Sequence, residues 1–514
     1  MLAFTLGFIS PPPLVVVVIF DQFRYDYITR LYPYFRRDGF RRLIERGAFF
    51  TQCHHVHIPT YTAPGHATIS TGTVPRFHGI VGNVWYDTRT SERVYAVSDP
   101  AAEAVGGKYR WGESPKNLLA NTVGDELKLK TGFRGKVISL SLKDRAAILM
   151  GGHLADMAVW FSTEDGHFIT SSYYTADAPA WLKDFNSKRL PGRYFGRTWR
   201  PYGPPEAYAS AGSGSFSHHL GTRSEVPDRR FFRELKATPF GNDLLLELLK
   251  AAVVGESLGR DDIPDLLLVS FSANDYVGHK YGPHSAEVVD MVLRSDSIVA
   301  EMLRFLDRRV GRGRYVLVLT SDHGVAPVPE TLSSRGMLAG RLSYDTVRAR
   351  INSILTAKFG EGDWVLSVSL PWVYLNDTLL SKHGSLREIR RLLKDSLMEV
   401  EGVLRVFTRE DMEEGRFPPE DMVARLAYNG FNPERSGDLI IIPKAFYVMG
   451  NYAATNHGTP YTYDTHVPLI FYGRGIRRGT HSAPCATTSI APTVSAILWS
   501  ESPAYSASPI LEVK

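Results

Sequence analysis

Three aspartates and three histidines stand at positions in this chain where side chains of those types would bind metal ions together. Most of them follow apolar segments, and the six are Asp21, Asp275, His279, Asp322, His323 and His457. Mixed nitrogen and oxygen ligands suit Zn²⁺ and suit Ca²⁺ or Mg²⁺ poorly. Six side chains exceed the needs of one tetrahedral ion. Two ions about 4 Å apart, which would bridge the attacking and leaving oxygens of a phosphoryl group, account for the set.

A short run of small, turn-forming and hydroxyl residues, PTYTAPGHATISTG at residues 59–72, places Thr62 before a Pro-Gly turn and the apparent start of a helix. Backbone N–H groups point outward at a helix N-terminus and the helix dipole favours negative charge, so a phosphate or sulfate would be held beside Thr62. An ordinary N-cap or turn threonine has the same local sequence. This stretch alone leaves both interpretations open.

Groups that would bind the oxygens of an anion also occur. Lys143 and Arg145 follow an apolar segment at residues 136–142, and if the strand continues through them both side chains project from one face. They would then clamp a dianion, Arg145 by a bidentate fork and Lys143 as a point charge. Asn83, in the glycine-flanked loop GIVGNVWYD, has an amide that would donate to an oxyanion. An exposed strand end and a plain turn residue are the alternatives.

The elements that must position these groups are buried strands. Residues 14–20, 265–271 and 315–320 are continuous apolar runs of the kind buried on both faces of a mostly parallel sheet. Functional sites are assembled at the carboxyl edge of such a sheet, although Asp21 would equally suit a helix cap. Asp275 and His279 are four residues apart, so a helix after the second strand would place both on one face.

The segment HHVH contains His54, His55 and His57 and resembles a metal site at first sight. It lies in a run with strand character, where neighbouring side chains point to opposite faces, and it contains no carboxylate. These histidines are therefore predicted to pack in the interior or to support the site from outside it.

The length of 514 residues is ample for a large core, and we predict one catalytic α/β domain over residues 14–514 with two insertions. The first, about residues 152–239, is irregular and rich in Trp, Tyr, Gly and Ser, as expected of a cap over a site. The second, about residues 333–449, alternates helix and strand patterns, for example at 386–400 and 402–407. A long amphipathic helix is expected at about 284–308, and a closing helix near 488–498.

Composition excludes several classes of protein. A hydrophobic content of 44% with 22% charged residues is typical of a soluble globular protein, and the formal net charge of +5 gives little support to nucleic-acid binding. Residues 2–20 carry no charge, but three prolines at 11–13 would break a helix, so stable membrane insertion is not expected. Residues 1–13 are interpreted as a signal remnant or leader.

Cysteine usage is sparse. Cys53 and Cys485 are the only two, far apart and without a CxxC pair, which excludes a zinc finger or a disulfide scaffold. A single long-range disulfide stays open, since sequence does not show whether the two residues meet.

Together these residues resemble the alkaline phosphatase superfamily, specifically its threonine-nucleophile, phosphate-irrepressible (PafA-type) members. The motifs that carry the resemblance span nearly the whole chain in family order: Asp21, T-x-P-G-H at Thr62, Asn83, Lys143-x-Arg145, Asp275-x-x-x-His279, Asp322-His323-Gly324, His457-Gly-Thr-Pro and the later THVPL. The resemblance implies an alkaline-phosphatase-like three-layer sandwich with a mostly parallel central sheet, helices on both faces and inserted cap segments.

The same resemblance implies a ligand set and a reaction. One Zn²⁺ would be held by Asp275, His279 and His457, and a second by Asp21, Asp322, His323 and the Thr62 oxygen; Asn83, Lys143 and Arg145 would contact the phosphoryl oxygens. The expected activity is hydrolysis of small-molecule phosphate monoesters through a phosphothreonine at Thr62, in the periplasm or outside the cell, by a monomer.

Three rival functions remain. A nucleotide pyrophosphatase or phosphodiesterase shares the ligands and the threonine, but the paired Lys143 and Arg145 favour a monoester, which has two negative charges to neutralise. Sulfatases share the fold yet have Cys or Ser in a C/S-x-P-x-R motif, where this chain has T-A-P-G-H. A non-catalytic surface protein on an inactivated scaffold would lack a ligand or the nucleophile, and here all are present.

Overall fold

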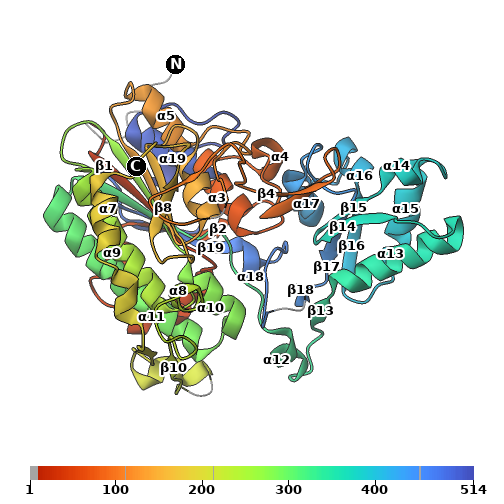
Figure 1. Cartoon of the computed structure of the whole chain (residues 1–514), viewed down its shortest axis with the longest axis horizontal. Helices are drawn as coiled ribbons and strands as arrows, with labels where there is room; N and C mark the ends of the chain where they lie inside the picture. The colour runs from red at the N-terminus through yellow and green to blue at the C-terminus, as the bar shows by residue number, and fades with distance from the viewer. Residues whose placement is uncertain (1–9, 110, 212–213, 451–452, 514) are drawn as a thin grey trace.

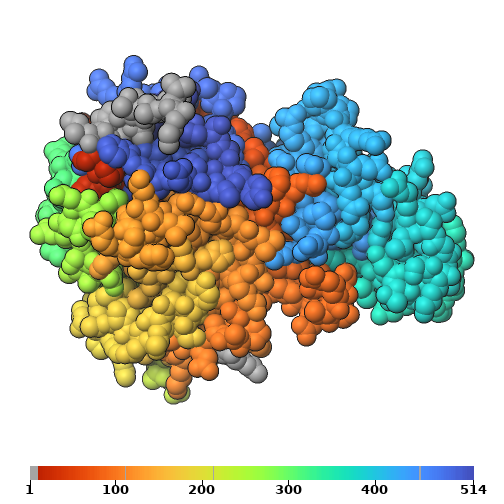
Figure 2. Space-filling model, turned by 90° about the horizontal axis from the view of Figure 1, so that it is seen from above, coloured from red at the N-terminus to blue at the C-terminus, as the bar shows by residue number. Residues whose placement is uncertain are grey.

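The computed structural model describes residues 10–109, 111–211, 214–450 and 453–513. Residues 1–9, most of the segment interpreted as a signal remnant or leader, lie outside the described residues. Figure 1 shows a large body built on one central sheet and a smaller lobe beside it, and Figure 2 shows the lobe projecting from the same side of the body.

The central sheet has eleven strands, and its middle is parallel. The strand order is β20 (Gly479–His481), β2 (Ala48–His54), β19 (His466–Gly473), β12 (Tyr315–Thr320), β1 (Leu14–Phe20), β11 (Asp265–Phe271), β6 (Val137–Ser141), β7 (Met157–Phe161), β8 (Phe168–Ser171) and β5 (Ala104–Val105), with β21 (Cys485–Ala486) also paired to β2. From β12 to β7 every neighbouring pair is parallel, whereas β19 runs antiparallel to β12 and to β2. The predicted fold class is confirmed.

Helices cover both faces of this sheet, and this explains why the sequence of β1 is apolar throughout. Val16 and Val18 pack into the core formed with α9 (Pro239–Gly255) and α11 (Ala286–Leu306). Val15 and Val17 pack on the other face, into the core formed with α5 (Val123–Lys130) and α19 (Ile490–Leu498). Successive side chains of a strand alternate between faces, so a strand covered on both sides has no solvent-facing position for a polar residue.

Residues 152–239 form a mixed segment. They begin with β7 and β8, which extend the central sheet, and continue as α7 (Ala180–Ser187) and α8 (Arg229–Lys236) with short 3₁₀ turns between them. The tryptophans of this segment serve the core, since Trp160 and Trp199 are almost fully buried. The first part of the segment is therefore an integral part of the sheet, and only the later part is added outside it.

The lobe consists of residues 340–449 and has its own sheet. Its strands follow the order β14 (Val365–Ser369), β15 (Trp372–Leu375), β17 (Leu439–Pro443) and β16 (Val403–Thr408). Helices α13 (Tyr344–Phe359) and α15 (Leu386–Leu397) cover one face and enclose a separate apolar core. The other face packs on the body, where Trp372 and Phe407 share a cluster with Ile58 and Trp85.

No helix among the described residues is both long enough and apolar enough to cross a membrane.

Candidate active site

The predicted ligands meet at the carboxyl ends of adjacent parallel strands. Asp21 directly follows β1, Asp322 follows β12 after one intervening residue, and Asp275 lies on α10 (Ala273–Tyr281), which follows β11. Because β12, β1 and β11 are neighbours in the sheet, their ends lie side by side. The topology thus gathers residues from three distant parts of the sequence at one edge, as expected for an open α/β sheet.

The first cluster consists of Asp275, His279 and His457. Asp275 Oδ1 lies 3.1 Å from His279 Nε2 and 3.6 Å from His457 Nε2, and the two Nε2 atoms are 3.2 Å apart. Asp275 and His279 share one face of α10, which confirms the prediction made from their spacing. His457 comes from a loop in the C-terminal part of the chain.

The second cluster consists of Asp21, Asp322, His323 and the hydroxyl of Thr62. His323 Nε2 lies 3.4 Å from Asp322 Oδ2, 3.6 Å from Asp21 Oδ1 and 3.5 Å from Thr62 Oγ1. The His323 ring stacks on His457 with centroids 3.6 Å apart, so the two clusters adjoin. Asp275, His323 and His457 also offer ligand atoms close to one another, which marks the boundary between the clusters.

The donor set fits divalent cations. His279, His323 and His457 each place Nδ1 within 2.7–2.9 Å of a backbone carbonyl, of Thr455, Gly324 and Thr60 respectively. A carbonyl only accepts, so Nδ1 carries the proton and Nε2 keeps a lone pair that faces the cluster. Among the described residues, Asp21 Oδ1 and Asp322 Oδ2 are buried and have no hydrogen-bond partner. Buried acceptors of this kind require a cation or a donor.

Thr62 is the first residue of α3 (Thr62–Thr71), and Tyr61 is its N-cap. The prediction of a Pro-Gly turn after Thr62 is wrong, because Pro64 and Gly65 lie inside the first helical turn, where proline loses no helix hydrogen bond. A Cβ at Gly65 would lie 2.2 Å from the backbone oxygen of Asp322. Glycine therefore lets α3 press against the loop after β12 and brings Thr62 to the second cluster.

Lys143 and Arg145 are placed differently from the prediction. Strand β6 ends at Ser141, whose hydroxyl accepts from the Lys143 N–H, and Lys143 becomes the N-cap of α6 (Asp144–Gly151). The two side chains therefore do not project from one strand face. Lys143 Nζ nevertheless enters the site: it donates to Asp21 Oδ2 at 2.7 Å and to Asp275 Oδ2 at 2.6 Å, and lies 3.3 Å from Thr62 Oγ1.

Charge explains why Lys143 stays protonated. Burial alone would lower the pKa of Lys143, but Asp21 and Asp275 raise it above its usual value. Burial would also raise the pKa of Asp275, yet His279 and Lys143 hold it well below its ordinary value. Among the described residues the site thus gathers three buried carboxyl groups around one ammonium, and burial together with the nearby Asp322 raises the pKa of Asp21. Divalent cations would offset the cost of burying these groups in their charged form.

Asn83 and Arg145 approach the same region from outside the strands. Asn83 Oδ1 accepts from the Ala63 N–H at 2.9 Å, which fixes the amide orientation at the start of α3. Arg145 Nη1 donates to Tyr95 Oη at 3.3 Å, and Arg145 Nε is buried with no partner among the described residues. Tyr95 in turn donates to Asp144 Oδ1 at 2.5 Å.

Sequence reasoning missed Gln22 and Tyr95. Gln22 has a left-handed backbone with φ 61, from which its N–H donates to Asp322 Oδ1 at 3.1 Å and its Nε2 to Asp275 Oδ1 at 2.7 Å. It thus links carboxylates of both clusters, and its position next to Asp21 was the only sequence signal. Tyr95 lies far from Arg145 in sequence, and nothing local indicated their contact.

The three histidines of HHVH lie outside both clusters. His55 is buried, with Nε2 3.1 Å from the Ser321 carbonyl and Nδ1 3.1 Å from the Thr487 hydroxyl. His54 stacks on His466, and His57 is fully buried. His55 therefore supports the loop that carries Asp322.

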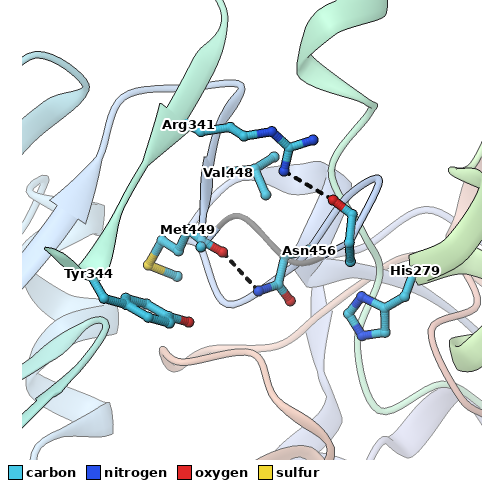
Figure 3. A pocket seen from close by; sticks show the side chains of 8 residues that line it. His279, Arg341, Tyr344, Val448, Met449 and Asn456 are labelled. Atoms are coloured by element: carbon cyan, nitrogen blue, oxygen red, sulfur yellow. Dashed lines mark hydrogen bonds between the residues drawn. The ribbon is translucent and has the colours of Figure 1, made fainter. Parts of the chain in front are cut away.

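A cavity of about 260 Å³ opens beside His279 (Figure 3). Its walls come from the strands and helix at the start of the lobe, with Arg341 and Tyr344, and from Val448, Met449 and Asn456. Asn456 Nδ2 donates to the Met449 carbonyl at 2.9 Å, and Arg341 Nη1 to the Ala453 carbonyl at 3.0 Å. The exposed part of the His279 ring faces this space.

Comparison with known proteins agrees with this geometry. The family described as Type I phosphodiesterase / nucleotide pyrophosphatase matches residues 15–467. Alkaline phosphatase PafA of Elizabethkingia meningoseptica is 37% identical over 98% of this chain and 94% of its own. Alkaline phosphatase PhoV of Synechococcus elongatus is 36% identical over 97% of this chain and 92% of its own. The crystal structure of wild-type PafA superposes with a TM-score of 0.92 at 36% identity, covering 98% of this chain and 99% of that one.

The chain therefore belongs to the type I phosphodiesterase / nucleotide pyrophosphatase family, and it is a phosphoester hydrolase. Within the alkaline phosphatase superfamily it is of the PafA type, and its fold is that of PafA.

Proposed function

We propose that this protein is a zinc-dependent alkaline phosphatase that hydrolyses small-molecule phosphate monoesters through a phosphothreonine at Thr62 and releases inorganic phosphate. The observation that carries the proposal is the position of Lys143 Nζ, 3.3 Å from the Thr62 hydroxyl and between the carboxylates of the two adjoining clusters. A nucleophile, a fixed cation and two candidate metal sites thus converge on one point.

In this proposal Asp275, His279 and His457 hold one Zn²⁺, and Asp21, Asp322, His323 and the Thr62 oxygen hold the other. Bound zinc would lower the pKa of a hydroxyl or water and stabilise negative charge on a leaving oxygen. Gln22 would hold the ligands in place, since its N–H donates to Asp322 Oδ1 and its Nε2 to Asp275 Oδ1. The paired carbonyl contacts of the histidine Nδ1 atoms serve the same purpose. His66 would fix the start of α3, since its Nδ1 lies 2.8 Å from the Thr62 carbonyl.

The protein residues then account for the two chemical steps. Thr62 Oγ1 gives its proton to solvent water and forms a bond to phosphorus while the bond from phosphorus to the alcohol oxygen breaks, and the departing oxygen takes up a proton from water. Lys143, Arg145 and the Asn83 amide donate to the non-bridging oxygens, where charge develops. A water then attacks the phosphothreonine from the side that the alcohol left, which restores Thr62 and yields phosphate. In-line attack would put the departing alcohol on the side of the first cluster, where the cavity beside His279 opens.

The decisive experiment compares initial rates on p-nitrophenyl phosphate and bis-p-nitrophenyl phosphate with zinc supplied at mildly alkaline pH. We expect the monoester to react much faster, because Lys143 and Arg145 would neutralise its second negative charge. Equal or faster turnover of the diester would assign the protein to the phosphodiesterase branch and leave those residues without their proposed role.

Metal removal provides an independent measurement. Dialysis against a chelator is expected to abolish turnover, and Zn²⁺ to restore it better than Mg²⁺ or Ca²⁺, because the clusters combine imidazole and carboxylate ligands. Elemental analysis of the restored protein should give close to two zinc ions per chain. Full activity of the metal-free protein would contradict the two-zinc site.

The Tyr95 hydroxyl is expected to position Arg145. Tyr95→Phe removes the acceptor of Arg145 Nη1 and the donor to Asp144, so we expect kcat/KM for the monoester to fall by about tenfold with little change for the diester. Tyr173→Phe is the matched control, because the Tyr173 hydroxyl donates only to the His153 carbonyl at the surface. Equal losses on both substrates in Tyr95→Phe would indicate a general loss of structure instead.

We also propose that the protein acts in the periplasm or outside the cell, as a monomer. Phosphatase activity should then appear in the osmotic-shock fraction or the medium of the native host, and light scattering should give the mass of one 57.4 kDa chain. Activity confined to the cytoplasmic fraction would contradict this location.

A further inference from the structure

The fold brings together the only two cysteines of the chain. Cys53 lies in β2 and Cys485 in β21, and the two are register partners in parallel neighbouring strands. Paired strands lie about 4.8 Å apart, within the Cα separation of roughly 4.4–6.8 Å that disulfides span. Both thiols are free in the structure.

The side chains also share one face of the sheet. Cys53 is a fully buried member of the apolar core that α19 and α5 cover, and Cys485 packs against the same core from its edge. Partners in register on one face do not point apart, so their orientation does not prevent a disulfide. The two cysteines differ in exposure to solvent, because Cys485 is only partly buried and Cys53 is fully buried.

We propose that Cys53 and Cys485 form an intramolecular disulfide when the protein matures in an oxidising compartment, with an organic disulfide such as oxidised glutathione or the active-site disulfide of a thiol oxidase as the oxidant. The Cys485 thiolate attacks one sulfur of the oxidant, which breaks the oxidant's S–S bond and releases one thiolate. Cys53 then loses its proton and attacks the Cys485 sulfur of this mixed disulfide, releasing the second thiol. Two protein thiols are oxidised, and one disulfide is reduced to two thiols.

The pKa values and the exposure of the two thiols agree with a reaction in which Cys485 attacks first. The hydrogen bond with Cys53 lowers the pKa of the Cys485 thiol, and the same contact together with burial raises the pKa of the Cys53 thiol. Cys485 is thus the more acidic and the more accessible of the two, and it is the one that an oxidant reaches first. Cys53 is held beside it as the resolving thiol.

The disulfide would link the C-terminal segment, which contains β21 and α19, to the part of the chain that leads to Thr62. The residue after β2 is His55 and the residue after β21 is Thr487, and the Thr487 hydroxyl contacts His55 Nδ1 at 3.1 Å. The following helix α19 packs against α3, the helix that begins at Thr62. A link that closes nearly the whole chain constrains the unfolded state strongly, so its main effect is on stability and not on the chemical step.

The test compares protein made in the periplasm with protein made in a reducing cytoplasm and then treated with oxidised glutathione. Peptide mapping without reductant is expected to show the Cys53 peptide linked to the Cys485 peptide, and no thiol should titrate in denaturant. Reduction should lower the midpoint of thermal unfolding by about 5 °C and leave kcat unchanged. The Cys485→Ser variant changes a partly exposed edge position and should unfold at one temperature with or without reductant.

Three outcomes would overturn the proposal. They are two titratable thiols after oxidation, a stable glutathione adduct on Cys485 without a link to Cys53, and a link between two chains. An unfolding midpoint that responds to reductant equally in the wild type and in Cys485→Ser would also count against it.

Discussion

Thr62→Ala is expected to reduce kcat for p-nitrophenyl phosphate by at least about a thousandfold, because the variant lacks the oxygen that would form the bond to phosphorus. The zinc content should stay near two per chain, since six other side chains provide ligands. Steady-state rates and elemental analysis of the same preparation measure both effects. Acid quenching of the wild type with ³²P-labelled substrate should leave the label on Thr62.

A variant that keeps the hydroxyl separates chemistry from structure. Thr62→Ser keeps a hydroxyl at the start of α3 and is expected to retain measurable turnover, whereas Thr62→Ala is not. If the alanine variant keeps full activity, another nucleophile operates. Simultaneous loss of zinc and activity would instead assign Thr62 mainly to metal binding.

Replacing both Lys143 and Arg145 by alanine is expected to reduce monoester hydrolysis by about 10²- to 10⁴-fold and diester hydrolysis by about tenfold or less. The reason is charge: a monoester brings two negative charges to the site and a diester one. The ratio of kcat/KM values on the two p-nitrophenyl substrates measures the change. Equal losses would remove these residues from phosphoryl recognition.

Lys143 requires its own control, because its ammonium also separates Asp21 from Asp275. Lys143→Ala could weaken metal binding through repulsion between these carboxylates, so zinc content is measured in every variant. Arg145 contacts neither Asp21 nor Asp275, so Arg145→Ala measures the loss of a substrate contact without a direct effect on these two carboxylates. Arg89→Ala removes an exposed guanidinium that pairs only with Asp87 and should change neither rate.

Much of the site follows from strand patterns alone. Asp21, Asp275 and Asp322 come after three apolar runs, and parallel strands end at a common edge, so their proximity could be predicted without coordinates. The pairing of Asp275 with His279 follows from helical spacing in the same way. His457 is counted with the other five as a residue at the end of a strand, but the structure places it in the loop between β18 (Tyr447–Met449) and α18 (Thr462–Thr465).

The remaining features depend on contacts that no local pattern encodes. The hydroxyl of Ser141 accepts from the Lys143 N–H, and β6 ends at Ser141 and does not continue through Arg145, so Lys143 caps a helix. Tyr95 is the last residue of β4 (Glu92–Tyr95), which pairs with β3 (Val84–Asp87) as a hairpin, and its contact with Arg145 joins this hairpin to α6. Likewise β7 and β8 lie in the irregular segment from residue 152, and only the pairing of β7 with β6 and of β8 with β7 shows that they belong to the central sheet.

The absence of a side chain at Gly65 has a consequence for the range of substrates. With α3 pressed against the Asp322 backbone, Thr62 and the second cluster form one rigid unit that has no room to adjust to the incoming molecule. The cavity beside His279 is lined by the lobe, at Arg341 and Tyr344, and by the body, at Asn456, and none of its lining residues belongs to that unit. We therefore expect a generalist enzyme, in which reactivity across phosphate monoesters follows the acidity of the departing alcohol more closely than its shape.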